Sequence, residues 1–108
     1  MTTPPISLTT APLDHSRTGV ALAGELDVYT APQIEAELTR LARRTERELL
    51  LDLAGVTFCD SSGAALFLRM HRRCVADGVR LRLCRVQRLP ARVIRTLGVD
   101  RAVACSFA

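Results

Sequence analysis

Lysine and tryptophan are absent from this 108-residue sequence, and aromatic side chains make up only 4% of it. Without lysine, the chain has no phosphate-binding loop of the Walker type, which requires a lysine after its glycines. With so few aromatic rings, the hydrophobic core has to be built from Leu, Val, Ile and Ala. The scarcity of rings also argues against binding of single-stranded nucleic acid, which depends on stacking of bases on aromatic side chains.

Long hydrophobic runs and metal-binding patterns are also missing. No apolar run reaches the roughly 20 residues of a membrane-spanning helix, and the start of the chain lacks the features of a signal peptide. The four cysteines, at positions 59, 74, 84 and 105, form no Cys-x-x-Cys pair. We therefore expect a cytoplasmic protein of one domain, residues 1–108, with reduced cysteines, no metal, no cofactor and no membrane partner.

The 15 basic residues are all arginines, and they are unevenly distributed. Up to Asp60, five arginines accompany nine acidic residues, whereas from Ser61 onward ten arginines accompany two acidic residues. The arginines are dispersed over predicted helices and one strand instead of forming a basic tract. We therefore expect no nucleic-acid partner, and we interpret the arginines as solvated faces or as a surface complementary to an acidic protein.

Hydrophobic periodicity predicts an α/β domain with the element order β-β-α-β-α-β-α. This order is typical of a mixed four-stranded sheet with about four helices, whose later strands are parallel. We expect Leu49 to Leu51 to be buried on both faces of the sheet, their strand to end near Asp52 and Gly55, and residues 1–5 to be frayed. The expected elements are strands near 6–9, 20–26, 49–51 and 79–83, helices near 31–44, 61–77 and 90–97, and a further helical turn within 99–104.

The helix ends and buried faces follow from the same patterns. Thr30 is expected to cap the first helix, and Gly78 is expected to end the second in a left-handed conformation. The third helix is expected to begin at Pro90 and to end at Gly98. The residues expected to be buried are Ile34, Leu38 and Leu41 in the first helix, and Val93, Ile94 and Leu97 in the third.

Residues 60–63, Asp-Ser-Ser-Gly, stand where a strand-end loop becomes a helix. The first turn of a helix presents backbone N–H groups without partners and the positive end of the helix dipole, so it accommodates negative charge. A serine in this position can cap the helix or carry a phosphate, and the simplest interpretation is a cap by Asp60 or Ser61. The full capping box is missing, because Ala64 and Ala65 stand where a Glu or Gln would reach back.

A second loop is expected at the same edge of the sheet. Asp27 follows the second strand as Asp60 and Ser61 follow the third, and open α/β sheets place their sites at the carboxyl ends of parallel strands. Tyr29, the only tyrosine, lies in the same loop as Asp27. It is either a contact anchor for a partner or a residue packed over the first helix.

Catalysis by one of the serines has little support. The sequence has no G-x-S-x-G motif, and neither His15 nor His71 is placed by sequence as a base for a serine nucleophile. We therefore predict that the protein is not an enzyme.

Three segments together resemble the anti-sigma factor antagonist family of STAS domains. They are GELDVYTAP at residues 24–32, LLLDLAGVTFCDSSG at 49–63 and VIRTLGVDRAV at 93–103. The resemblance covers nearly the whole chain and implies a STAS-like fold, in agreement with the mixed sheet expected above. The sequence departs from the commonest family pattern at Ala64-Ala65, which replaces a Leu-Gly type pair, and at Cys59, where Ile or Met is usual.

The resemblance also implies a partner-switching cycle. The serine after the aspartate, here Ser61, is phosphorylated by a cognate anti-sigma factor, an ATP-binding serine kinase with a histidine-kinase-like fold. The unmodified antagonist binds this kinase and frees a sigma factor; the phosphorylated form is released, and a phosphatase restores it. Ser62 and Gly63 match supporting residues of the family, and Asp27 and Asp60 match positions at the partner surface. The alternative is a STAS-type scaffold or regulatory module in a stress-signalling assembly that does not directly control a sigma factor.

Overall fold

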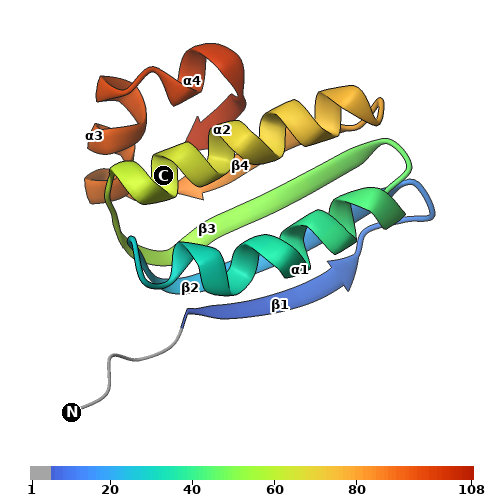
Figure 1. The fold of residues 1–108 in the computed structure, drawn as a ribbon, viewed down its shortest axis with the longest axis horizontal. Coiled ribbons are helices and arrows are strands. Elements are labelled where there is room, and N and C mark those ends of the chain that lie inside the picture. Colours follow the sequence, from blue (N-terminus) through green and yellow to red (C-terminus); the bar gives the residue numbers. More distant parts are fainter. Residues whose placement is uncertain (1–5) are drawn as a thin grey trace.

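The computed structural model describes residues 6–108, so the frayed start expected for residues 1–5 lies outside the described residues. The chain forms a five-stranded sheet, and the two longest helices, α1 and α2, lie side by side across one face of it (Figure 1). The elements in chain order are β1 (Ser7–Pro12), β2 (Arg17–Leu26), α1 (Ala31–Arg44), β3 (Glu48–Cys59), α2 (Ser61–Ala76), β4 (Arg80–Val86), α3 (Arg88–Thr96), α4 (Val99–Ala102) and β5 (Ala104–Phe107).

The strands lie in the sheet in their chain order. β1 and β2 form an antiparallel hairpin, and the pairs β2–β3, β3–β4 and β4–β5 are all parallel. The mixed α/β sheet with parallel later strands is therefore confirmed, and the expected extra helical turn is α4. The prediction of four strands missed β5, a strand of four residues that pairs with β4. None of the helices formed by residues 6–108 combines the length and the apolarity needed to span a lipid bilayer.

Burial in β3 alternates along the strand. Leu49, Leu51 and Leu53 are fully buried beneath the helices, whereas Leu50 and Asp52 are half-buried on the opposite face. The expectation that the leucine run is buried on both faces was therefore wrong. All the larger helices cover the same side of the sheet, so the other side meets solvent (Figure 1).

β3 is also longer than expected, because Asp52 and Gly55 mark irregularities within the strand instead of its end. The register with β2 shifts twice, once between the pairs Ala21–Asp52 and Ala23–Gly55 and once near Phe58. At the first shift the Asp52 carboxylate accepts a 3.1 Å hydrogen bond from the Ala54 N–H. Each shift inserts one extra residue into β3, as a β-bulge does, and the strand continues to Cys59.

The helices follow the predictions in part. α1 ends at Arg44 as expected and buries Ile34, Leu38 and Leu41, and Gly78 adopts the left-handed conformation after α2, with a φ of 73°. α3 begins at Arg88, so Pro90 lies in its first turn instead of starting it. Leu97 was expected to be buried but is 49% exposed, and Ala91 joins Ile94 on the buried face of α3.

The two ends of the described chain lie at opposite edges of the sheet but at the same end of it. Ser7 of β1 pairs with Ala23 near the carboxyl end of β2. At the other edge, Phe107 of β5 pairs with Val86, the last residue of β4. Ser7 and Phe107 are therefore both close to the carboxyl ends of the parallel strands (Figure 1).

Two leucine substitutions in β3 test the one-sided burial. Leu51→Ala should lower the free energy of unfolding by about 2 to 5 kcal/mol, because it removes a fully buried side chain from the core. Leu50→Ala makes the same chemical change on the open face and should cost less than about 1 kcal/mol. Urea denaturation of the two variants measures both values, and equal losses would contradict the alternation.

Candidate functional site

The first turn of α2 is capped by Asp60. One oxygen of its carboxylate, Oδ1, accepts hydrogen bonds from the Ser62 N–H at 2.8 Å and the Gly63 N–H at 3.3 Å. The Asp60 backbone is extended, and its own N–H donates to the Leu26 carbonyl at 3.1 Å. Of the two cap residues that the sequence allowed, the structure therefore uses Asp60, and it ties the cap to the end of β2.

Because Asp60 caps α2, the Ser61 side chain is not needed as a cap. It is the first residue of α2 and is exposed, and among residues 6–108 its hydroxyl has no hydrogen-bond partner. Ser62 beside it is half-buried. A solvent-facing hydroxyl at the positive end of a 16-residue helix can accept a phosphoryl group without breaking an internal contact.

Gly63 lets the start of α2 approach the sheet closely. A Cβ added at Gly63 would lie 2.6 Å from the Cys59 Sγ and 3.0 Å from the Leu26 Cβ, so a larger residue would force α2 away. The Cys59 thiol is buried, donates a 3.4 Å hydrogen bond to the Asp60 carbonyl, and has its pKa raised to about 12 by burial. Cys59 is therefore a packing residue with almost no thiolate at neutral pH.

The loop that carries Asp27 is held by its own hydrogen bonds. Asp27 Oδ1 accepts from the N–H groups of Thr30 and Tyr29, each at 2.9 Å, and the Thr30 N–H contributes most to lowering the pKa of Asp27. Thr30 precedes α1 as expected but does not cap it. Its hydroxyl instead donates to the Glu25 carbonyl and accepts from the Asp27 N–H. The loop is thereby fixed beside the end of β2.

Two hollows meet at Ser61. One, of about 370 Å³, lies between the start of α1 and the start of α2. The other, of about 240 Å³, lies between Ser61 and α3. The first is lined by Val28, Ala31, Pro32, Ser61, Ser62, Ala65 and Arg69, and the second by Ser61, Arg92, Val93, Thr96 and Leu97.

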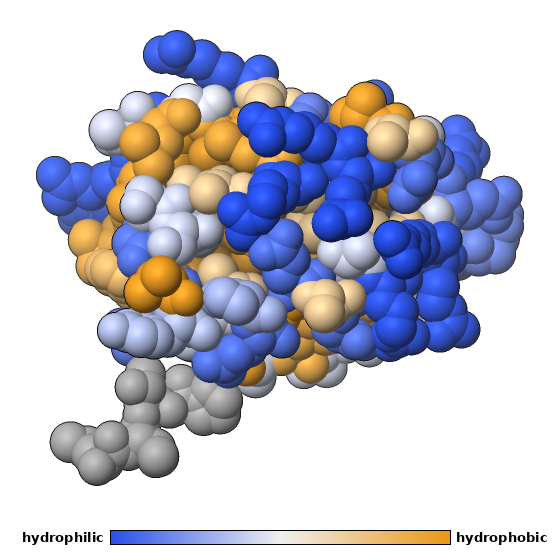
Figure 2. All heavy atoms as spheres, viewed as in Figure 1, coloured by the Kyte–Doolittle hydropathy of each residue, from blue (hydrophilic) through white to orange (hydrophobic). Residues whose placement is uncertain are grey.

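Exposed apolar side chains gather around these hollows. Tyr29 is 78% exposed, which excludes the packed position over α1 that the sequence left open, and Val28 beside it is also exposed. Leu97 of α3, which lines the second hollow, adds to this surface. In Figure 2 the apolar residues gather at the end of the molecule where Figure 1 places α3 and the start of α2, whereas the opposite end is mostly polar. We call Val28, Tyr29, Val93 and Leu97 the apolar rim.

One ion pair fastens the two helices beneath the rim. Arg69 of α2 donates to both oxygens of Glu35 of α1, at 2.9 and 2.8 Å. The hydrogen bonds from Arg69 lower the pKa of Glu35. Although Arg69 lines the same hollow as Ser61, its guanidinium is engaged by a carboxylate in this structure.

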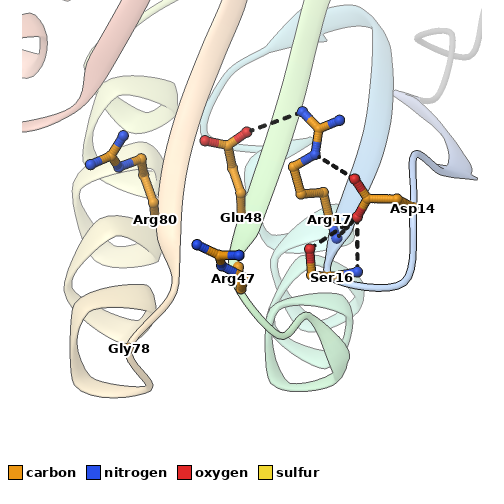
Figure 3. Close-up of a pocket in the computed structure, with 7 residues that line it drawn as sticks. All are labelled: Asp14, Ser16, Arg17, Arg47, Glu48, Gly78 and Arg80. Atoms are coloured by element: carbon orange, nitrogen blue, oxygen red, sulfur yellow. Dashed lines mark hydrogen bonds and ion pairs between the residues drawn. The ribbon is translucent and has the colours of Figure 1, made fainter.

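A larger polar hollow, of about 560 Å³, lies at the opposite end of the sheet. In Figure 3, Arg17 lies between Asp14 and Glu48, which it contacts at 2.9 and 3.9 Å. Arg47 and Arg80 complete the lining from the starts of β3 and β4. Within residues 6–108, no group of three or more His, Cys, Asp or Glu residues is placed to hold a metal ion, here or elsewhere.

The structure brings the predicted residues to one end of the sheet and adds others that the sequence reasoning missed. Ser62, Ala65 and Arg69 fall at i, i+3 and i+7 of one helix, so their common face could have been found from spacing. Arg92 of α3 could not, because its place beside Ser61 depends on how α3 packs. Both predicted aspartates hold their own loops, and their contact with a partner stays a prediction.

The cap predicts effects of different size on stability for two neighbouring substitutions. Asp60→Ala removes the acceptor for two backbone N–H groups and should destabilise the protein by about 0.5 to 2 kcal/mol. Ser61→Ala removes a hydroxyl without a partner and should change stability by less than about 0.5 kcal/mol. Thermal or urea denaturation checks both. A larger loss for Ser61→Ala than for Asp60→Ala would show that the serine, and not the aspartate, caps α2.

Sequence comparisons identify relatives of the chain. The family model described as "Mlab, STAS domain" matches residues 9–104. The anti-sigma-B factor antagonist of Staphylococcus aureus strain NCTC 8325 / PS 47 is 41% identical to this chain over 49 residues. Those residues make up 45% of this chain and 45% of the relative, so the match spans less than half of the relative's length.

Solved structures with the same fold cover nearly the whole chain. An anti-sigma factor antagonist from Mycobacterium paratuberculosis superposes with a TM-score of 0.79 at 24% identity, covering 96% of this chain and 89% of that one. The Bacillus cell fate determinant SpoIIAA in its phosphorylated form superposes with a TM-score of 0.70 at 21% identity, covering 93% and 91%. At these identities the superpositions establish the fold. The family model that matches residues 9–104 shows that the chain belongs to the STAS domain family.

Proposed function

We propose that the protein is an anti-sigma factor antagonist that is switched off by phosphorylation of Ser61. The observation that carries this proposal is the exposed Ser61 hydroxyl, which caps no helix and lies where two hollows with apolar walls meet. The similarity to a curated anti-sigma-B factor antagonist supports it, as does the phosphorylated form of SpoIIAA among the structural neighbours.

The unmodified protein presents a docking surface. The apolar rim lies on both sides of Ser61, with Val28 lining one hollow and Val93 and Leu97 the other. Burying exposed apolar area against a partner contributes about 25 cal/mol per Å². Tyr29 is suited to anchor such a contact, because tyrosine combines a large apolar ring with a polar tip. The proposed partner is an anti-sigma factor with an ATP-binding, histidine-kinase-like fold, and its capture by this surface frees a sigma factor.

The modification is a phosphoryl transfer from ATP. The Ser61 Oγ attacks the γ-phosphorus, a new O–P bond forms, and the bond from that phosphorus to the β,γ-bridging oxygen breaks, so that ADP leaves. The hydroxyl proton passes to a base of the kinase. In this chain, the Asp60 cap holds the first turn of α2 in place, so the hydroxyl is presented in one position on an ordered helix.

Phosphorylation changes the surface while the fold persists. The phosphate adds about −1.5 to −2 charges beside Asp60, at a helix end whose dipole favours an anion. A docked partner would have to bury this charge, and an unpaired buried charge costs several kcal/mol. Since each ~1.4 kcal/mol is a tenfold change in affinity, a cost of about 4 kcal/mol weakens the complex about a thousandfold.

Return to the active state requires a phosphatase. Attack of water on the phosphorus releases inorganic phosphate and regenerates the Ser61 hydroxyl. Because the serine is exposed, the phosphorylated residue is accessible to a second enzyme once the kinase has left. The cycle therefore needs two proteins that bind the same end of the sheet in turn, first the kinase partner and later the phosphatase.

Capture of partners from a lysate of the native host tests the proposal. Wild type and Ser61→Ala should retain a small ATP-binding serine kinase, identified by mass, and Ser61→Glu should lose it because of its negative charge. Ala76→Glu is the matched control, since it adds the same charge to an exposed position at the far end of α2 and should retain the kinase.

Two results would overturn the proposal. If all three Ser61 proteins retain the same partners, Ser61 is not the switch and residues 60–63 serve only to start α2. If the purified protein instead assembles with itself into large particles and captures no kinase, a scaffold function takes the place of partner switching.

A further inference from the structure

Two arginines line the hollows on either side of Ser61, and only one of them has a carboxylate partner. Arg69 donates two hydrogen bonds to Glu35. Arg92, in the hollow of about 240 Å³ between Ser61 and α3, is exposed, and it takes part in none of the ion pairs formed among residues 6–108. The guanidinium of Arg92 is thus available to an anion in that hollow.

Among the described residues that line this hollow, Arg92 is the only cation. Val93 and Leu97 contribute apolar walls, and Thr96 contributes a hydroxyl. The nearest carboxylate along the chain is that of Asp60, whose Oδ1 is occupied by two backbone N–H groups. A phosphate on Ser61 would therefore meet one free guanidinium, and arginine pairs with phosphate through two parallel N–H donors.

We infer that Arg92 is the cation that holds the phosphate of phosphorylated Ser61, bridging the start of α2 to α3. This inference rests on the proposed function, because it concerns the modified form of the same serine. The contact gives the phosphate a second effect besides its charge. By drawing the long Arg92 side chain over the hollow, it covers the wall formed by Val93 and Leu97, which belongs to the apolar rim that the partner needs.

Arg92 acts through the phosphate and not on a reacting atom, so it is a positioning residue. Its neighbour Arg95 provides a matched comparison on the same helix. The Arg95 guanidinium lies 4.0 Å from the centre of the Phe107 ring, away from the residues that line the hollow. Substituting either arginine by glutamine removes one positive charge from α3, but only Arg92 is placed to contact Ser61.

The test uses the full chain with phosphoserine incorporated directly at position 61, so that no kinase is needed. The phosphorus NMR signal is followed against pH, because the second pKa of phosphoserine, about 6, falls when a cation holds the dianion. In the folded wild type this pKa should lie below its value in the same protein unfolded in urea. Arg92→Gln should raise it by about 0.5 units, and Arg92→Lys should restore part of the difference.

Arg95→Gln is the control variant. It should leave the phosphoserine pKa unchanged, because the Arg95 guanidinium lies against the Phe107 ring. Urea denaturation of the unphosphorylated Arg92→Gln protein should match that of wild type, which excludes a folding defect. An unchanged pKa in Arg92→Gln, or a shift of the same size in Arg95→Gln, would overturn the inference.

The outcome is independent of the partner-capture experiment. If Arg92→Gln leaves the phosphoserine pKa unchanged while Ser61→Glu still loses the kinase, the proposed function stands and the Arg92 contact is wrong. If Arg92 holds the phosphate but no captured protein distinguishes the Ser61 variants, the contact stands and the switching function fails.

Discussion

The close packing of the start of α2 against the end of β2 is the constraint on which the site depends. Gly63 is the residue that permits it, since any Cβ there would collide with Cys59 and Leu26. Asp60 completes the junction by bonding to the Leu26 carbonyl through its N–H and to the first turn of α2 through its carboxylate. Ser61 is held between these two residues, with a defined position and a hydroxyl that the fold does not use.

Within residues 60–63, this arrangement separates the residue that stabilises α2 from the residue proposed to be phosphorylated. A serine that capped its own helix would lose a stabilising contact on modification, so phosphorylation would weaken the fold. Here the cap belongs to the preceding aspartate. The proposed phosphorylation of Ser61 would therefore keep the cap and change only the charge of the surface. A partner docked on the apolar rim would exclude water from a phosphate on Ser61. The charge would then weaken the complex, because an anion is costly where it loses its water.

The sequence predicts what depends on local pattern and misses what depends on packing. Periodicity, turn residues and strand order predict the helix α1 and the left-handed Gly78. They also predict that Asp27 and Asp60 lie at the same end of the sheet, at the carboxyl ends of the parallel strands. The length of β3 does not, because Asp52 and Gly55 are turn-forming residues that the sheet accommodates as irregularities. β5 was missed because Ala104–Phe107 is too short for an alternating signal, and the exposure of Leu97 reflects the way α3 packs against its neighbours.

The placement of the two chain ends affects how the protein can be handled. Ser7 and Phe107 lie at opposite edges of the sheet, yet both are near the carboxyl ends of the strands, on either side of the Ser61 surface. An affinity tag or fluorescent protein fused directly before Ser7 or after Phe107 would lie beside that surface and compete for space with a docking protein. An insertion in the turn around His15, at the far end of the β1–β2 hairpin, would leave the surface clear.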